Sequence, residues 1–160
     1  MRSARRHHST VRRQRGFALV EFVIAAPILL LLTFASFEFS HYLLEYNRLN
    51  DAVNNAAAWA ATQALQGSDG VLASGSAWTT LAGQTQNMVV YGNAAGTGTP
   101  VLPSLNTGEV SVTQNTSNND VTVSVAYPYI SLFGGAIPTF MGGSISTTYT
   151  LSITATMEAI

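Results

Sequence analysis

The chain has 160 residues, enough for one modest domain with an accessory segment, and contains no cysteine, which excludes a disulfide framework and a thiolate metal site. Only 9% of its residues are charged, against roughly 25% in an ordinary soluble domain. The net charge of −1 conceals a segregation: six of the seven basic residues lie within the first 15 positions, and one arginine against eight acids gives residues 17–160 a net charge of −7.

Residues 1–16 form a basic segment without apolar periodicity, in which Arg12, Arg13 and Arg15 stand immediately before an apolar run. A basic arm of this kind binds nucleic acid in some proteins, because arginines neutralise phosphates. In others it is the cytoplasmic flank of a membrane helix. The adjoining apolar run favours the membrane interpretation, in which Arg12, Arg13 and Arg15 determine the topology and no nucleic acid is bound.

Residues 17–37 are predicted to form a single transmembrane helix, since only four of them (Glu21, Pro27, Thr33 and Ser36) fall outside the hydrophobic class. Twenty-one helical residues span roughly 31 Å, the thickness of a bilayer core. Arginines before the span and none just after it predict a cytoplasmic amino terminus and a carboxyl-terminal domain outside the cytoplasm. An interfacial aromatic belt is expected on the exit side, formed by Phe34, Phe37, Phe39, Tyr42 and Tyr46.

Residues 38–66 are expected to continue this helix as an amphipathic segment, giving one helix over about residues 18–66 that is roughly 70 Å long. Apolar residues recur at spacings of three and four, which predicts a continuous stripe that packs on another element. The stripe consists of Phe39, Leu43, Tyr46, Leu49, Val53, Ala57, Ala60 and Ala64. Gly67 is a plausible stop.

Residues 67–160 are predicted to form a β-rich domain outside the cytoplasm. The period-two alternation of 109–113 and 121–129 around a polar loop indicates a hairpin. Residues 144–157 are expected to be a third strand and 87–92 a fourth, whereas 67–78 and 92–108 have the composition of turns and loops. The predicted fold class is therefore α+β, a long amino-terminal helix packed on a small antiparallel sheet.

The position of Gly16 argues against an ordinary secretory signal. Such signals are cut at small residues after the apolar core, whereas Gly16 precedes the core. Cleavage after Gly16 would remove the arginines, keep the apolar helix and leave Phe17 as the new amino terminus.

The string "RGFALVEF", with an aromatic residue after glycine and glutamate at the fifth following position, resembles a class III prepilin leader. The longer string "RGFALVEFVIAAPILLLLTFASFEF" is similar to the TadE-like family of pseudopilins from the tight-adherence (Tad) secretion and pilus system. The matching features are Arg15-Gly16, Val20-Glu21-Phe22, Pro27 with the leucines after it, and Glu38. The resemblance is specific over roughly residues 15–45.

This resemblance implies that a prepilin peptidase cuts between Gly16 and Phe17, and that Glu21 and Phe22 serve processing or assembly. It implies a minor subunit of the bacterial inner membrane that joins a pilus and contributes to adhesion. The implied partners are the peptidase, the major pilin, sister pseudopilins and the membrane assembly platform.

Glu21 also has a physical interpretation that needs no resemblance. The amino group exposed on Phe17 would lie four residues away on the same helix face, where it could pair with Glu21 of its own or a neighbouring subunit. An unpaired carboxylate within hydrocarbon costs about 2.5–3.5 kcal/mol, so pairing favours association. The alternative is a glutamate whose side chain merely reaches the cytoplasmic headgroups.

Pro27 leaves the carbonyl of Val23 without its usual donor. A functional kink and a merely tolerated bend are equally consistent with this position.

Further patterns argue against catalysis and cofactors. Glu38, His41 and Glu45 share a helix face, yet a di-iron site needs matching ligands from other helices, so an interfacial polar cluster is preferred. His41 is the one histidine after the leader, and the chain lacks lysine, so we expect neither an enzyme nor a nucleotide site nor a bound metal. The apolar loop 131–143, with Ile137, Phe140 and Met141, is either a contact surface or part of the core, and the core is slightly favoured.

A rival hypothesis is a static signal-anchored envelope protein whose β domain binds a ligand and whose residues 1–16 persist. A weaker third is a DNA-binding membrane protein that uses the arginine arm.

Overall fold

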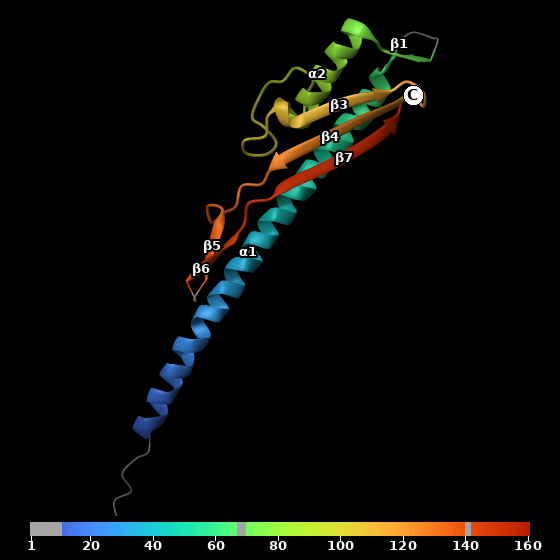
Figure 1. Cartoon of the computed structure of the whole chain (residues 1–160). Coiled ribbons are helices and arrows are strands. Elements are labelled where there is room, and N and C mark those ends of the chain that lie inside the picture. Colours follow the sequence, from blue (N-terminus) through green and yellow to red (C-terminus); the bar gives the residue numbers. More distant parts are fainter. Residues whose placement is uncertain (1–10, 67–69, 140–141) are drawn as a thin grey trace, which may run out of the picture.

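The computed structural model describes residues 11–66, 70–139 and 142–160, so the first ten residues of the predicted leader, with Phe140 and Met141, lie outside the described part. Figure 1 shows a long helix whose carboxyl-terminal half carries the rest of the fold. The principal elements are α1 (Val11–Gln63), α2 (Gly75–Tyr91), β3 (Val110–Asn115), β4 (Asp120–Pro128), β5 (Ala136–Thr139), β6 (Gly143–Ser146) and β7 (Thr150–Glu158). The short elements are β1 (Leu65–Gln66), β2 (Val71–Leu72) and the 3-10 turn η2 (Thr107–Glu109).

Helix α1 has 53 residues and runs without interruption through Pro27. It ends at Gln63, three residues before the predicted end, where the chain enters the short antiparallel pair β1–β2. The single continuous helix and the small antiparallel sheet on its second half confirm the predicted α+β class.

The main sheet has the order β3-β4-β7, with both neighbouring pairs antiparallel. The predicted hairpin is confirmed, and its register pairs Val110 with Val125 and Asn115 with Asp120. Alternation along each strand turns valines, Tyr127 and Leu151 toward α1 and leaves threonines and serines outside. The outer hydroxyls pair across β4 and β7, as in Thr122–Thr156 at 2.9 Å, so the uncovered face of the sheet is polar.

The core lies between this sheet, α2 and the second half of α1. Leu49, Val53 and Ala57 are fully buried, as the predicted stripe requires. The same prediction is wrong at its beginning, because Phe39, Leu43 and Tyr46 are exposed. At this level Glu38 and Glu45 are buried and Tyr42 is half-buried instead, and these three residues continue the Leu49 face with helical spacing.

The second helix, α2, corrects two further predictions. Residues 75–78, expected in a loop, form its first turn, and residues 87–91, expected in a strand, form its last. Leu81, Thr85 and Val89 are buried at four-residue intervals against α1 and β3, so the period is helical. The helix ends at Gly92, whose φ of 71° favours glycine and whose N–H donates to the Met88 carbonyl.

Residues 144–157 form two strands where one was expected. The break at 147–149 exists because β6 pairs with β5 in a separate hairpin, whereas β7 pairs with β4. The Tyr149 carbonyl accepts from the N–H of Tyr129, and the Gly135 carbonyl accepts from the N–H of Thr147. The β5–β6 hairpin is thereby directed along α1, away from the main sheet and toward the amino-terminal half of the helix (Figure 1).

Candidate functional site

The amino-terminal half of α1 projects beyond the rest of the fold (Figure 1). Among the residues that the structure describes, α1 is one helix long and apolar enough to cross a membrane, and its most apolar 18-residue stretch has no buried residue. Phe17 is 75% exposed and Phe22 68%. A helix that is apolar all round and has no partner within its own chain must be covered by lipid or by other subunits.

Gly16 and Phe17 lie inside α1, a few residues after its start at Val11. A Cβ atom added to Gly16 would meet nothing within 4 Å, and the backbone there is helical. Among the described residues, neither packing nor backbone conformation therefore requires glycine at this position. Glycine also weakens a helix interior relative to alanine by about 1 kcal/mol.

Glu21 is exposed on α1 and makes no hydrogen bond or ion pair with any side chain that the structure describes. It lies four residues after Phe17, one helical turn away, as the predicted pairing requires. The backbones of Arg12, Arg13 and Arg15 belong to the first turns of α1. The predicted roles of these residues, and of Phe22 and Pro27, stay predictions.

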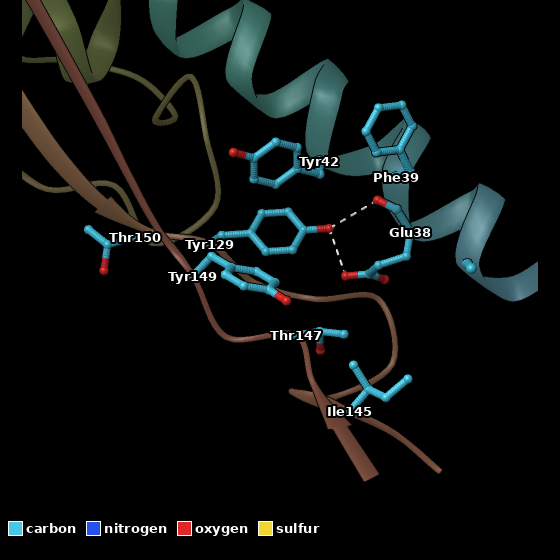
Figure 2. Close-up of a pocket in the computed structure, with 9 residues that line it drawn as sticks. Glu38, Phe39, Tyr42, Tyr129, Ile145, Thr147, Tyr149 and Thr150 are labelled. Carbon is cyan, nitrogen blue, oxygen red and sulfur yellow. Dashed lines mark hydrogen bonds between the residues drawn. The ribbon is translucent and has the colours of Figure 1, made fainter. Parts of the chain in front are cut away.

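A buried polar cluster lies where the apolar half of α1 ends. Its centre is Glu38, 8% exposed, whose two carboxyl oxygens both accept hydrogen bonds. Tyr129 Oη donates to Oε1 at 2.8 Å (Figure 2), and the backbone N–H of Leu132 donates to Oε2 at 3.2 Å. Two accepting oxygens are the pattern of a carboxylate, which can be buried only when its lone pairs are satisfied. Glu38 therefore holds the segment after β4 against α1.

His41 and Glu45 extend the cluster along the same helix face. His41 Nδ1 lies 3.1 Å from Tyr129 Oη. Since the tyrosine proton is given to Glu38, this contact requires a proton on Nδ1. The other ring nitrogen, Nε2, lies 3.6 Å from Oε1 of Glu45. Glu45 is 3% exposed, and its Oε2 has no hydrogen-bond partner among the described residues.

Burial shifts the pKa values of this cluster. It raises the pKa of Glu45, whereas interactions with His41, Tyr127 and Arg48 lower that pKa by smaller amounts. Burial, followed by the charge of Glu45, raises the pKa of Tyr127 to about 12. Burial and the bond to Glu38 raise the pKa of Tyr129 further above its ordinary value. Both tyrosines therefore remain hydrogen-bond donors at any physiological pH, with Tyr127 donating to the Pro103 carbonyl at 2.8 Å.

Beside the cluster is a groove with a volume of about 510 Å³. One wall is α1, and the other is formed by Tyr129, just after β4, and by side chains between Ile145 and Thr150. Its lining is mostly aromatic and aliphatic, with Glu38 at one wall (Figure 2). The lining residues are Ala35, Glu38, Phe39, Tyr42, Tyr129, Ile145, Thr147, Tyr149 and Thr150.

The sequence identified Glu38, His41 and Glu45 as a polar cluster but did not identify Tyr129. No local pattern links Tyr129 to Glu38, since 91 positions separate them. Within the described residues, no group of three or more His, Asp or Glu side chains is arranged to hold a metal ion.

A protein-family model described as TadE-like protein matches residues 16–58. Residues 16–58 are similar to the TadE-like family. The predicted resemblance is thereby confirmed for the segment that begins at Gly16 and ends within α1, and that contains Glu21, Pro27 and Glu38. Comparisons with curated proteins and with solved structures find no match. The TadE-like family is associated with the Tad pilus system and with the membrane, and the long apolar helix is compatible with membrane anchoring.

Proposed function

We propose that this protein is a minor pilin-like subunit of a tight-adherence pilus system. It is made as an inner-membrane precursor with a cytoplasmic amino terminus, cut between Gly16 and Phe17, and then joined through α1 to a pilus or its assembly machinery. The domain outside the cytoplasm contributes to packing and surface adhesion. The observation that carries this proposal is the TadE-like match, which begins at Gly16.

The surroundings of Gly16 support the cleavage site. No contact with the residues that the structure describes, and no backbone angle, requires glycine there, although glycine costs stability in a helix. A requirement from outside the fold accounts for it, and a peptidase that needs bare backbone beside the cut bond is such a requirement. Cleavage removes Arg12, Arg13 and Arg15, which orient the precursor and have no place in a mature apolar helix.

The exposure of Glu21 supports a role in assembly. The carboxylate lies among exposed apolar side chains and has no partner among the described side chains of its own chain. In a bilayer it costs about 2.5–3.5 kcal/mol when unpaired, and the new amino group of Phe17 would lower that cost. When the pair forms between two subunits, lateral association of apolar helices is favoured over isolated residence in lipid.

The partners under this proposal are a prepilin peptidase, the major pilin, sister pseudopilins and the membrane assembly platform. The proposal assigns no catalysis and no cofactor to the chain. His41, the one histidine after the leader, already contacts Tyr129 and Glu45.

The test is the mass of the intact protein extracted from membranes of cells that carry the pilus system. A mature chain that starts at Phe17 is expected, and a precursor that starts at Met1 or Arg2 would refute the cleavage. Cells with an inactive prepilin peptidase are the control, and there the precursor should persist. Gly16→Asp should also leave the precursor uncut, because a charged side chain replaces bare backbone at the bond. Normal maturation of this variant would contradict the site.

The rival hypothesis of a signal-anchored envelope protein rests on the groove beside Glu38, which has the size and apolar lining of a ligand site. It predicts that residues 1–16 persist. The same mass measurement therefore separates the two functions.

A further inference from the structure

The chain between β4 and β7 exposes apolar side chains that neither the core nor the proposed pilus role explains. We name residues 130–139 and 142–149 the juxtamembrane lobe; it contains strands β5 and β6 and excludes the main sheet. Its exposed apolar residues are Ile130, Leu132, Phe133, Ile145 and Tyr149, with exposed fractions between 38% and 56%. This cluster is separate from the polar outer face of the main sheet, which consists of hydroxyl-bearing residues.

Two contacts place the lobe along α1. The ring of Phe133 lies 5.4 Å from the ring of Phe34, centroid to centroid. The backbone N–H of Leu132 donates to Glu38. Phe34 belongs to the predicted span 17–37 and lies three residues, or about 4.5 Å, before its end. When α1 crosses the bilayer, Phe133 therefore lies at the depth of the outer hydrocarbon boundary, beside Phe34 of the helix.

The chemistry of the lobe suits this depth. From residue 121 to residue 157 the sequence contains no Asp, Glu, Lys, Arg or His. Tyr149 is of the kind that concentrates at membrane interfaces, and Phe133 adds a large apolar ring. Antiparallel pairing of β5 with β6 satisfies backbone groups that would otherwise be costly in a medium poor in water. The apolar groove beside Glu38 opens between the lobe and α1 and extends the same surface.

The charged residues of the folded domain lie elsewhere. Asp120 and Glu158 pair with each other in the register of β4 and β7, near the carboxyl end of α1, where the Ile160 N–H donates to Ala61. Ala61 is 24 residues beyond the predicted span, or roughly 36 Å along the helix. One end of the domain thus carries acidic residues, whereas the lobe itself has no charged side chain and the neighbouring Glu38 of α1 is buried under two hydrogen bonds.

We propose that the juxtamembrane lobe lies in the outer interface of the phospholipid bilayer, as a second membrane contact beside α1. A helix alone leaves a domain free to rotate about the helix axis and to tilt. A second contact at one side of that axis limits the tilt of the domain relative to the membrane. This inference depends on α1 spanning the bilayer but not on cleavage at Gly16 or on a pilus.

The experiment uses the absence of cysteine from the chain. Single cysteines are introduced in the full-length protein by Leu132→Cys and Ile145→Cys, both at exposed positions, and labelled with a nitrobenzoxadiazole fluorophore. The proteins are inserted into phosphatidylglycerol–phosphatidylcholine vesicles. Quenching by doxyl-labelled phospholipid reports contact with lipid, and quenching by aqueous iodide reports contact with water. Two controls are matched: Leu30→Cys within the span, and Ser117→Cys in the exposed β3–β4 turn.

The labels at Leu132 and Ile145 are expected to be quenched by doxyl lipid, as at Leu30, and to be several-fold less sensitive to iodide than the label at Ser117. Iodide sensitivity equal to that at Ser117, with lipid quenching at Leu30, overturns the inference and leaves the span intact. Absence of lipid quenching at Leu30 overturns both. A further measurement uses vesicles that hold one chain each. If the labels at Leu132 and Ile145 lose their protection from iodide in these vesicles, the inference is also overturned, because the lobe would then be an interface between copies of the protein.

Discussion

The hydrogen bond between Tyr129 and Glu38 provides the strictest test of the buried polar cluster. Tyr129→Phe keeps the ring, and with it the packing against Tyr42 at 5.4 Å between centroids. It removes the hydroxyl that donates to Glu38 Oε1 at 2.8 Å and that lies 3.1 Å from His41 Nδ1. Hydrogen bonds to charged groups contribute about 1.5–3 kcal/mol, and the loss leaves a buried carboxyl oxygen without a donor.

We therefore expect Tyr129→Phe to lower the free energy of unfolding by about 2 kcal/mol, measured by denaturant titration of the full-length protein in detergent micelles. The backbone amide of Leu132 should also exchange its hydrogen faster, since the second oxygen of Glu38 holds that amide in place. Hydrogen exchange followed by mass spectrometry of a peptide covering residues 129–135 measures this effect.

Tyr127→Phe is the matched control, because Tyr127 is equally buried and donates to a neutral acceptor, the Pro103 carbonyl. Its loss should be smaller, about 0.5–1.5 kcal/mol. Glu38→Gln completes a double-mutant cycle with Tyr129→Phe, and a coupling energy above about 0.5 kcal/mol is expected for groups in contact. Equal losses in the two tyrosine variants, with no coupling to Glu38 and unchanged exchange at Leu132, would refute the role of the cluster.

Three further predictions follow from burial and charge. Burial raises the pKa of Glu45 in the folded state above its ordinary value of 4.5, so protonation of Glu45 stabilises the fold, and this stabilisation is lost as pH rises from about 4.5 through the raised pKa. Glu45→Gln should abolish this decline in the free energy of unfolding, measured by denaturant titration between pH 4 and pH 8. An unchanged decline in the variant would contradict the prediction. Leu49→Ala should lower the free energy of unfolding by about 2–5 kcal/mol, because it opens a cavity in the core. Leu43→Ala, at an exposed position of the same helix, should lower it by less than about 1 kcal/mol. Similar losses in the two variants would show that the buried face of α1 is assigned wrongly. Glu21→Ala should leave membrane insertion unchanged, by carbonate extraction, but reduce co-purification with other pilus subunits; unaltered co-purification would refute its role in assembly.

The sequence by itself determined the elements whose patterns are local. A run of 21 residues with only four outside the hydrophobic class indicates a membrane helix, and alternation on both sides of a polar turn indicates the β3–β4 hairpin. The motif around Gly16 and Glu21 is also local, which is why the TadE-like resemblance was visible from residue order and is confirmed over residues 16–58.

Helix α2 was not predicted because its buried face and its exposed face differ little in polarity. Thr85 is fully buried between Leu81 and Val89, with its hydroxyl bonded to the Leu81 carbonyl, so a polar residue occupies a core position. Adjacent valines near the end of α2 imitate a strand. The helical period of α2 became evident only in the structure, where α1 and β3 bury one face of the helix.

Only the tertiary structure decided which face of α1 is buried at the level of the membrane exit. The alternatives there were the aromatic stripe through Phe39 and the polar face through Glu38, and hydrophobicity alone favours the first. The end of β4 brings the Tyr129 hydroxyl and the Leu132 amide to Glu38, so burial of the carboxyl group is offset by two hydrogen bonds. A donor that lies 91 positions away in the chain leaves no trace in the local sequence, because only folding brings it to its acceptor.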